Sequence, residues 1–143
     1  MFEKILYPTD FSDVAMKALP YVEHLRLAGC REVVILHVID SRSLDLLCYD
    51  PAHYRSVEND LEALARENCS FITKRLEKCG LTVRVDVRTG NPASQILKVQ
   101  AREHADAIVI GSHGKSNLAE MIIGSVSERV IRNASCPVLV VKR

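Results

Sequence analysis

Short apolar runs that alternate with segments of helical periodicity most constrain the fold of this 143-residue chain. Four runs are apolar along their length, as in strands buried on both faces: 4–7, 32–39, 107–110 and 137–141. A fifth run, 81–87, alternates apolar and polar residues, which is typical of a strand at a sheet edge with one less buried face. This alternation predicts a single α/β domain over residues 1–143, with an open five-stranded parallel sheet covered by helices on both faces.

The segments between the predicted strands have helix start and stop signals. Ser12 is a suitable N-cap and Gly29 follows the last turn of the first helix, while Pro20 inside it is expected to introduce a kink. Three further helices are expected over about 52–79, 92–104 and 125–131.

Two connections are harder to interpret. Residues 89–92, Thr-Gly-Asn-Pro, indicate a turn before a helix with Asn91 as N-cap and Pro92 in its first turn. Residues 40–51 indicate a polar loop, yet 44–49 is apolar for a loop. It either covers a ligand or an interface, or forms a short helix over the core, and the sequence does not decide between these.

Composition excludes several classes of protein. The net charge is +1, so the chain offers no electrostatic basis for binding nucleic acid or an anionic membrane. No apolar run approaches the length of a membrane span, and we expect a cytoplasmic protein. The five cysteines have no Cys-x-x-Cys pair and are expected to be free thiols packed as small hydrophobes, and the scattered histidines do not suggest a metal cluster.

The loop after the fourth predicted strand carries the strongest functional signal. It contains Gly114-Lys115-Ser116, the end of a Walker A motif, but the first glycine of that motif would fall on Val109 inside the strand. A Rossmann glycine pattern fails as well, because residue 113 is His113. The spacing that stands is Gly111-x2-Gly114-x9-Gly124-Ser125.

Each part of this spacing has a physical reason to hold a phosphate. Gly111 permits close approach of a ring or ribose, and Gly114 allows a positive φ that would turn successive N–H groups into one concavity. Gly124 and Ser125 open a helix, whose free N–H groups and positive dipole end favour an anion. Because parallel sheets bind ligands at the carboxyl ends of their strands, this loop predicts a phosphate site.

The sequence is similar to the universal stress protein family, and to its ATP-binding branch in particular. The nucleotide signature of that branch, G-x2-G-x9-G-[ST], is matched in full, and the similarity extends over essentially the whole chain. Further matching stretches are "YPTDFS" at 7–12, "LHVID" at 36–40, "GNP" at 90–92 and "CPVLVVKR" at 136–143.

The resemblance implies a fold, a ligand and an assembly. The fold is that of the adenine nucleotide alpha hydrolase-like proteins, with strand order 3-2-1-4-5. Asp10 would bind the ribose or lie near a phosphate-bound Mg²⁺, with no other metal site implied. ATP would be held by residues that follow the first strand, end the second strand, and form the loop after the fourth strand with the helix start that follows it: Pro8, Thr9, Asp10, Val38, Gly111, Ser112, His113, Gly114, Lys115, Ser116, Asn117, Gly124, Ser125, Val126 and Ser127. The last strand, with Val138, Leu139, Val140 and Val141, would pair with its copy in a homodimer.

We therefore expect an ATP-binding module of stress response or signalling. Hydrolysis would be slow or partner-dependent, since no Walker B acid, arginine finger or water-positioning residue is evident. The alternative is a Mg²⁺-dependent ATP hydrolase or another adenylate-handling enzyme, with Asp10 and His113 in chemical roles. A nucleotide-free dimerisation module is a third interpretation, disfavoured by the intact glycine signature. Lys115 would meet a phosphate or remain solvated.

Overall fold

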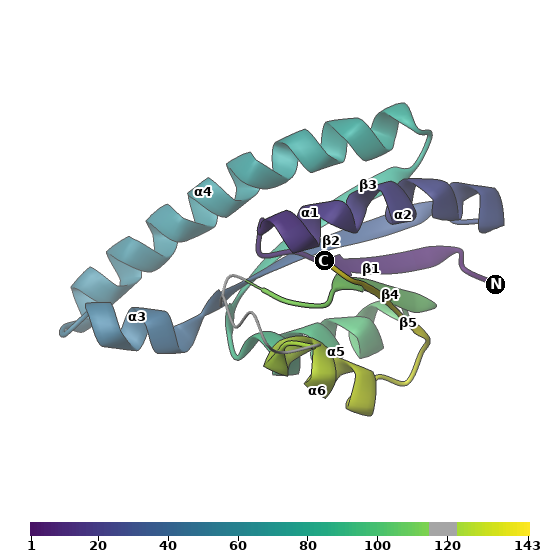
Figure 1. Ribbon diagram of the computed structural model, residues 1–143. Coiled ribbons are helices and arrows are strands. Elements are labelled where there is room, and N and C mark those ends of the chain that lie inside the picture. Colours follow the sequence, from purple (N-terminus) through teal and green to yellow (C-terminus); the bar gives the residue numbers. More distant parts are fainter. Residues whose placement is uncertain (115–122) are drawn as a thin grey trace.

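Five parallel strands form one sheet in the computed structural model, which describes residues 1–114 and 123–143. The strand order is β3-β2-β1-β4-β5 (Figure 1), which confirms the predicted fold class and the order implied by the family resemblance. The strands are β1 (Lys4–Pro8), β2 (Glu32–Asp40), β3 (Thr82–Gly90), β4 (Ala107–Gly111) and β5 (Val138–Val141).

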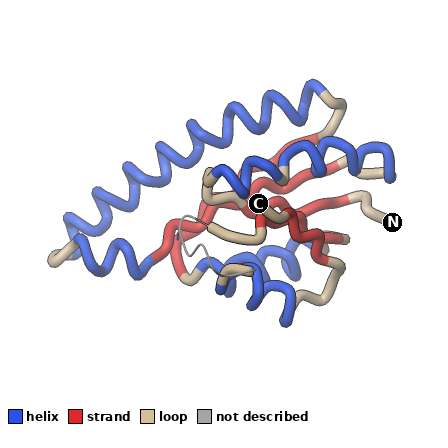
Figure 2. The backbone as a smooth tube through the Cα atoms, in the orientation of Figure 1, coloured by secondary structure: helices blue, strands red, loops and turns tan. Residues whose placement is uncertain are grey.

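Two helical layers cover the sheet, with α1, α2 and α4 on one face and α5 and α6 on the other (Figure 2). The short helix α3 extends directly from the end of β2. The helices are α1 (Asp13–Lys17), α2 (Leu19–His24) followed by a 3₁₀ turn (Leu25–Ala28), α3 (Ser41–Leu47), α4 (Pro51–Lys78), α5 (Pro92–Glu103) and α6 (Ser125–Asn133).

Alternate side chains of the central strands pack into two separate hydrophobic cores, one on each face of the sheet. In β2, Val33 and Ile35 belong to the core under α1, α2 and α4, whereas Val34 and Leu36 belong to the core under α5 and α6. All four are fully buried, as expected for a strand covered on both faces. Burying one such side chain stabilises the fold by about 1.5–3 kcal/mol, so the two cores fix the sheet between its helices.

The local structure differs from the sequence predictions in three places. The first helix is interrupted at Ala18, with Pro20 in the first turn of α2, so the expected kink is a break between two short helices. The polar loop predicted over 40–51 is wrong for 41–47, which form α3, because the Asp40 carboxylate caps it by accepting from Arg42 N. Thr89 and Gly90 belong to β3 and pair with β2, so the turn predicted there is shorter than expected.

The helix α4 runs over Pro51–Lys78, close to the predicted bounds. Its second half packs on the sheet through Cys69, Ile72 and Leu76, but its first half extends with α3 beyond the strands (Figure 1). Leu64 of this first half is consequently 52% exposed. Among the described residues, no helix is both long and apolar enough to cross a membrane.

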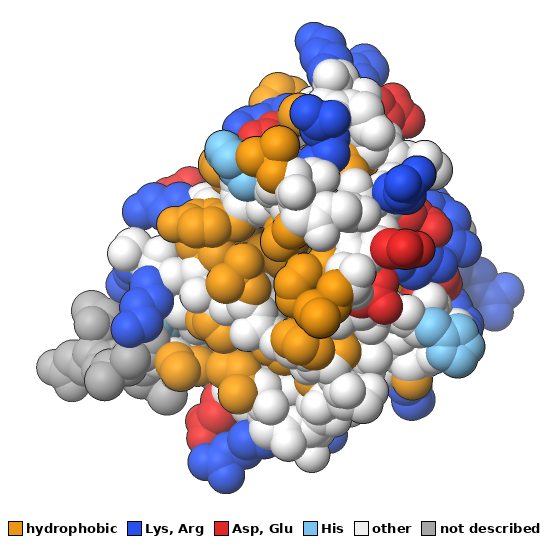
Figure 3. Space-filling view, turned by 90° about the vertical axis from the view of Figure 1, so that its right-hand side faces the viewer, with side chains coloured by type: hydrophobic (Ala, Val, Ile, Leu, Met, Phe, Trp, Pro, Cys, Tyr) orange, Lys and Arg blue, Asp and Glu red, His pale blue; other side chains and the backbone are white. Residues whose placement is uncertain are grey.

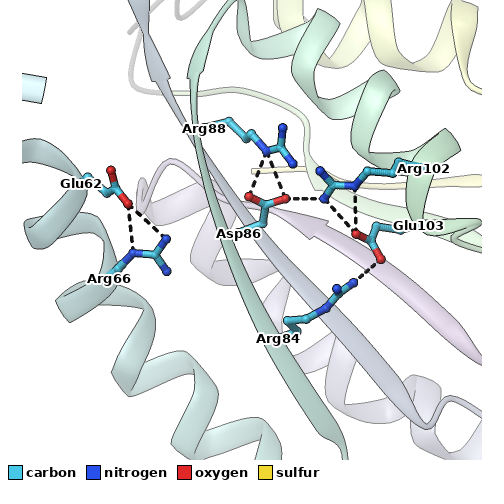
Figure 4. A network of polar contacts seen from close by, with 7 residues as sticks. All are labelled: Glu62, Arg66, Arg84, Asp86, Arg88, Arg102 and Glu103. Carbon is cyan, nitrogen blue, oxygen red and sulfur yellow. Dashed lines mark hydrogen bonds and ion pairs between the residues drawn. The ribbon is translucent and has the colours of Figure 1, made fainter. Parts of the chain in front are cut away.

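Charged side chains cover one face of the edge strand β3 (Figure 4). Asp86 of β3 accepts from Arg88 at 3.0 Å and from Arg102 of α5 at 2.7 Å, and Arg84 pairs with Glu103 of the same helix. Ionic side chains on an edge strand oppose pairing with a second sheet. The alternating pattern of 81–87 thus correctly predicted an edge strand.

The amino ends of the central strands are tied to one another. Lys4 N–H donates to the Asp106 carboxylate at 2.8 Å, and Asp106 N–H donates to the Lys4 carbonyl at 2.8 Å. The Lys4 ammonium also lies 3.3 Å from the carboxylate of Glu32 and 3.6 Å from that of Glu103. These contacts join β1 to β2, to the start of β4 and to α5.

Candidate functional site

A cavity of about 570 Å³ lies at the carboxyl ends of β1, β2 and β4. It is centred on the reversal of winding direction between β1 and β4, where open α/β sheets bind their ligands. Of the residues named from the sequence, those lining it are Pro8, Thr9, Asp10, Val38, Gly111, His113, Gly114, Ser125, Val126 and Ser127. Ser112 and Gly124 do not line it, and Lys115, Ser116 and Asn117 fall outside the described residues.

The turn after β1 presents Asp10 to the cavity. Thr9 N–H donates to the Leu36 carbonyl at 2.8 Å, which fixes the end of β1 against β2. The Asp10 carboxylate accepts from Ser12 N–H at 3.0 Å, and the Ser12 hydroxyl accepts from Ala15 N–H at the start of α1. Ser12 is therefore the N-cap as predicted, while Asp10 supports the turn before the helix and still lines the cavity.

Hydrogen bonds join the two ends of the loop after β4. Gly124 N–H donates to the Ser112 carbonyl at 2.6 Å, and the buried Ser127 hydroxyl donates to the Gly111 carbonyl at 2.7 Å. These bonds place the start of α6 directly beside the end of β4. At Gly124 the chain has thus returned to the end of β4.

The first turn of α6 has the properties of an anion site. Gly124 occupies the N-cap position with no side-chain hydrogen bond to the helix, so the N–H groups of Ser125, Val126 and Ser127 are the terminal donors. All three residues line the cavity, at the positive end of the helix dipole. Since the Ser127 hydroxyl donates to Gly111, its main-chain N–H is the group that faces an anion.

Each of the three glycines has neighbours that a side chain would disturb. A methyl group on Gly111 would lie 3.1 Å from Val14 and Ala15 backbone atoms, so the absence of a side chain there makes room for α1. Gly114 does not have the predicted positive φ. Its missing side chain leaves space for the Asp10 carboxylate, 2.7 Å from the position of a methyl carbon.

Gly124 is also closely surrounded. A methyl group there would lie 3.3 Å from the Ser112 carbonyl oxygen and 3.4 Å from His113 Cα. Its φ of −72° is accessible to other residues, so space and not conformation selects glycine. The prediction that Gly124 opens a helix is confirmed.

His113 is held by its neighbour. Its Nδ1 lies 2.8 Å from the Ser112 hydroxyl, and both residues are buried. Ser112 is fully buried and does not line the cavity, so this pair does not present a serine nucleophile to a ligand. The contact fixes the orientation of the His113 ring.

Sequence reasoning missed the wall that α3 and α4 contribute. Leu61, Ala65 and Asn68 of α4 line the cavity, as do Arg42 and Ser43 of α3 and the Phe11 ring. Arg42 pairs with Asp40 at 2.8 Å, and this hydrogen bond holds the pKa of the Asp40 carboxyl below its usual value. Leu61 and Ala65 recur at helical spacing, but such spacing alone does not distinguish a core position from a cavity wall.

Comparison with known proteins identifies the family of the chain. Residues 1–142 match the universal stress protein family. The chain is 41% identical to universal stress protein MJ0577 of Methanocaldococcus jannaschii, covering 100% of this chain and 96% of that protein. It is 33% identical to universal stress protein YxiE of Bacillus subtilis, over 99% and 100% of the two chains.

Solved structures give the same result. The MJ0577 structure superposes with a TM-score of 0.91, covering 100% of this chain and 97% of that one. A universal stress protein family member from Arabidopsis thaliana with AMP bound has a TM-score of 0.67 at 19% identity, covering 98% and 91% of the two chains. At that identity the likeness is one of fold. The family match over nearly the full length, together with the identity to MJ0577 and YxiE, shows that the chain belongs to the universal stress protein family.

Proposed function

We propose that this protein binds ATP at the cavity and acts as a nucleotide-dependent module of stress response or signalling. The observation that carries the proposal is the convergence of Asp10, the end of β4 and the first turn of α6 on one cavity. A carboxylate suits ribose hydroxyls, and a helix N-terminus suits phosphates. The AMP bound to the Arabidopsis relative supports an adenine nucleotide as the ligand class.

Each part of the nucleotide has a matching wall. The base would lie against Pro8 and Val38, with the main chain of Val38 contacting its edge. The ribose would meet Asp10. The phosphates would lie between Gly111–Gly114 and the N–H groups of Ser125, Val126 and Ser127, with Ser112 and Gly124 supporting this turn from behind. We propose Lys115, Ser116 and Asn117 as further phosphate contacts from the sequence motif.

Magnesium fits this arrangement as a companion of the phosphates. Mg²⁺ is commonly held by one or two carboxylates together with phosphate oxygens, and Asp10 is a carboxylate on the cavity wall. The ion would neutralise phosphate charge beside Asp10, which otherwise opposes an anionic ligand.

The output of the module would be conformational. A γ-phosphate that reaches the first turn of α6 would contact it in the ATP-bound protein and be missing in the ADP-bound protein, and a switch requires such a difference in contacts. We propose that hydrolysis is slow or needs a partner, and that the protein acts in the cytoplasm.

We further propose a homodimer through β5. Among the described strands, β5 pairs only with β4, and Leu139 is 41% exposed. Hydrophobic side chains also gather in the middle of the molecular face that lies on the right of Figure 1 (Figure 3). Pairing with a second copy would cover an apolar edge that a monomer leaves open.

Calorimetry on nucleotide-stripped protein tests the binding proposal. We expect heat of binding for ATP with Mg²⁺, its loss in Gly124→Val, and about two- to tenfold weaker binding in Ser125→Ala, because we propose that the Ser125 hydroxyl also contacts a phosphate. Ser70→Ala, on the exposed side of α4, is the matched control and should bind as the native protein does. Absence of binding heat in the native protein, or unchanged affinity in Gly124→Val, would refute the proposal.

The enzyme alternative is tested in the same samples, because Asp10 and His113 both line the cavity. Phosphate release over several hours, with and without Mg²⁺, separates a binding module from a hydrolase. Mg²⁺-dependent multiple turnover that Asp10→Asn abolishes without loss of binding would favour the hydrolase.

A further inference from the structure

His37 of β2 contacts both sides of Asp10 in the turn after β1. Its Nδ1 lies 2.8 Å from the Thr9 carbonyl oxygen, and since a carbonyl only accepts, Nδ1 carries the proton and donates. The Phe11 ring stacks on the imidazole, with centroids 4.7 Å apart and an interplanar angle of 27°. The residue before Asp10 and the residue after it are therefore both fixed by one side chain.

The turn that His37 supports has a costly backbone conformation. Phe11 has a φ of 62°, in the left-handed region that bulky residues rarely adopt. Its N–H donates to the Thr9 hydroxyl at 3.1 Å, and the next N–H, of Ser12, donates to the Asp10 carboxylate at 3.0 Å. Such a conformation persists only where surrounding contacts hold it, and it is frequent at ligand sites.

The neighbouring residues His37 and Val38 of β2 lie on opposite faces of the sheet. His37 stacks on Phe11, which packs against the core under α1, α2 and α4, whereas Val38 packs against the core under α5 and α6. The contact of His37 with the turn is thus separate from the surface that Val38 offers to a base.

We propose that His37 is a positioning residue for nucleotide binding, which holds the turn from Thr9 to Phe11 so that the Asp10 carboxylate lies against Gly114. This inference rests on the proposed function. The hydrogen bond to Thr9 and the stack on Phe11 keep the turn in its binding-competent conformation before the ligand arrives. When that preorganisation is lost, only a fraction of the molecules remains in the binding-competent state, and the apparent affinity falls in proportion to that fraction.

Two substitutions separate the hydrogen bond from the stack. His37→Phe keeps a ring but removes the donor, and His37→Asn keeps an N–H donor near the position of Nδ1 but removes the ring. His24→Phe is the matched control, because His24 Nδ1 also contacts a carbonyl, that of Pro20 at 2.7 Å, on the surface outside the cavity.

Two measurements follow on each variant. We expect His37→Phe to bind ATP about five- to tenfold more weakly by calorimetry, His37→Asn to recover part of that loss, and His24→Phe to match the native protein. In the nucleotide-free protein, amide hydrogen exchange at Asp10, Phe11 and Ser12 should be faster in His37→Phe, while exchange in the core strands stays native.

A double-mutant cycle with Asp10→Ala distinguishes positioning from direct contact. If His37 acts through Asp10, His37→Phe has little further effect on ATP affinity once Asp10 is replaced. Additive losses, or native exchange rates in the turn, would overturn the proposal. If amide hydrogens exchange rapidly throughout the His37→Phe chain, that variant is unfolded. The ATP affinity and the amide exchange rates of His37→Asn then test the proposal.

The outcomes also separate this inference from the proposed function. ATP binding by the native protein together with native affinity in both His37 variants overturns the positioning role alone. Absence of ATP binding in the native protein overturns both.

Discussion

Asp10 and Gly114 face each other so closely that a methyl group on the glycine would lie 2.7 Å from Asp10 Oδ2. The two residues come from loops more than a hundred positions apart and meet at the reversal point of the sheet. The space at Gly114 therefore sets the place of the carboxylate.

Gly114→Ala should weaken ATP binding by about tenfold, because the methyl group displaces the Asp10 carboxylate. Calorimetry measures this loss, and the same substitution in an Asp10→Gly background should have little effect because the clashing group is gone. An equal loss in both backgrounds would show that Gly114 acts independently of Asp10.

Gly111→Ala should destabilise the fold by about 1–3 kcal/mol, since the added methyl meets the backbone of Val14 and Ala15 at 3.1 Å. Urea unfolding measures the change. A native unfolding midpoint would mean that α1 can move away from β4 without cost.

Tyr7 should make the protein sensitive to alkali. Its hydroxyl is buried and donates to the Ala15 carbonyl at 2.7 Å, and burial raises its pKa from 10.0 to about 12. The unfolded chain therefore loses this proton first, so the contribution of Tyr7 to stability is complete below pH 10 and is lost as pH rises from 10 to 12.

Tyr7→Phe tests this linkage. We expect the variant to be about 0.5–1.5 kcal/mol less stable at neutral pH, because the Ala15 carbonyl loses the Tyr7 hydroxyl and keeps the Ala18 N–H as a donor. Its free energy of unfolding should also fall less steeply above pH 10 than that of the native protein. Parallel pH profiles would contradict the assignment.

The cysteines should react with Ellman's reagent in two groups. Cys30 and Cys69 are buried, and burial raises the pKa of each thiol to about 11, so little reactive thiolate forms at pH 8. Cys48 and Cys79 are partly exposed and should react first. Mass spectrometry of labelled peptides identifies the order, and urea should abolish the difference.

The proposed dimer can be tested at Val140. β4 bonds to the Pro137 and Val141 carbonyls, so the alternation of a parallel ladder directs the Val140 N–H away from β4. Val140→Pro removes that outward donor and should shift the protein from dimer to monomer in sedimentation measurements. A native circular dichroism spectrum is the control for folding, and an unchanged dimer would place the interface elsewhere.

Much of this molecule follows from local patterns in the sequence. Apolar runs such as 32–39 and 107–110 identified buried strands, and cap residues such as Ser12 and Asn91 identified helix starts. The loop after β4 was recognised because glycine spacing and a helix start are both local signals. The order of the five strands in the sheet was predicted only from the family resemblance, since hydrophobic periodicity does not specify which strands are adjacent.

The parts that sequence reasoning missed depend on contacts between distant segments. The role of Gly114 was wrongly attributed to its φ because the Asp10 carboxylate, which needs the space, comes from the turn after β1. A short helix was only one of two interpretations of 44–49, because the apolar segment that forms part of α3 has exposed residues and buries only Leu44. The cavity wall of α4 and the contact of His37 with Thr9 are tertiary features of the same kind.

The bonds that Lys4 and Asp106 exchange at the amino ends of β1 and β4 have a consequence for how this fold diversifies. They lie at the opposite end of the sheet from the cavity. One end of these strands therefore holds the sheet together, and the other end forms the proposed ligand site. Substitutions in the loops around the cavity can therefore alter ligand choice while the joined ends keep the strands aligned. A scaffold divided in this way can acquire new ligand specificities through substitutions that leave the protein folded.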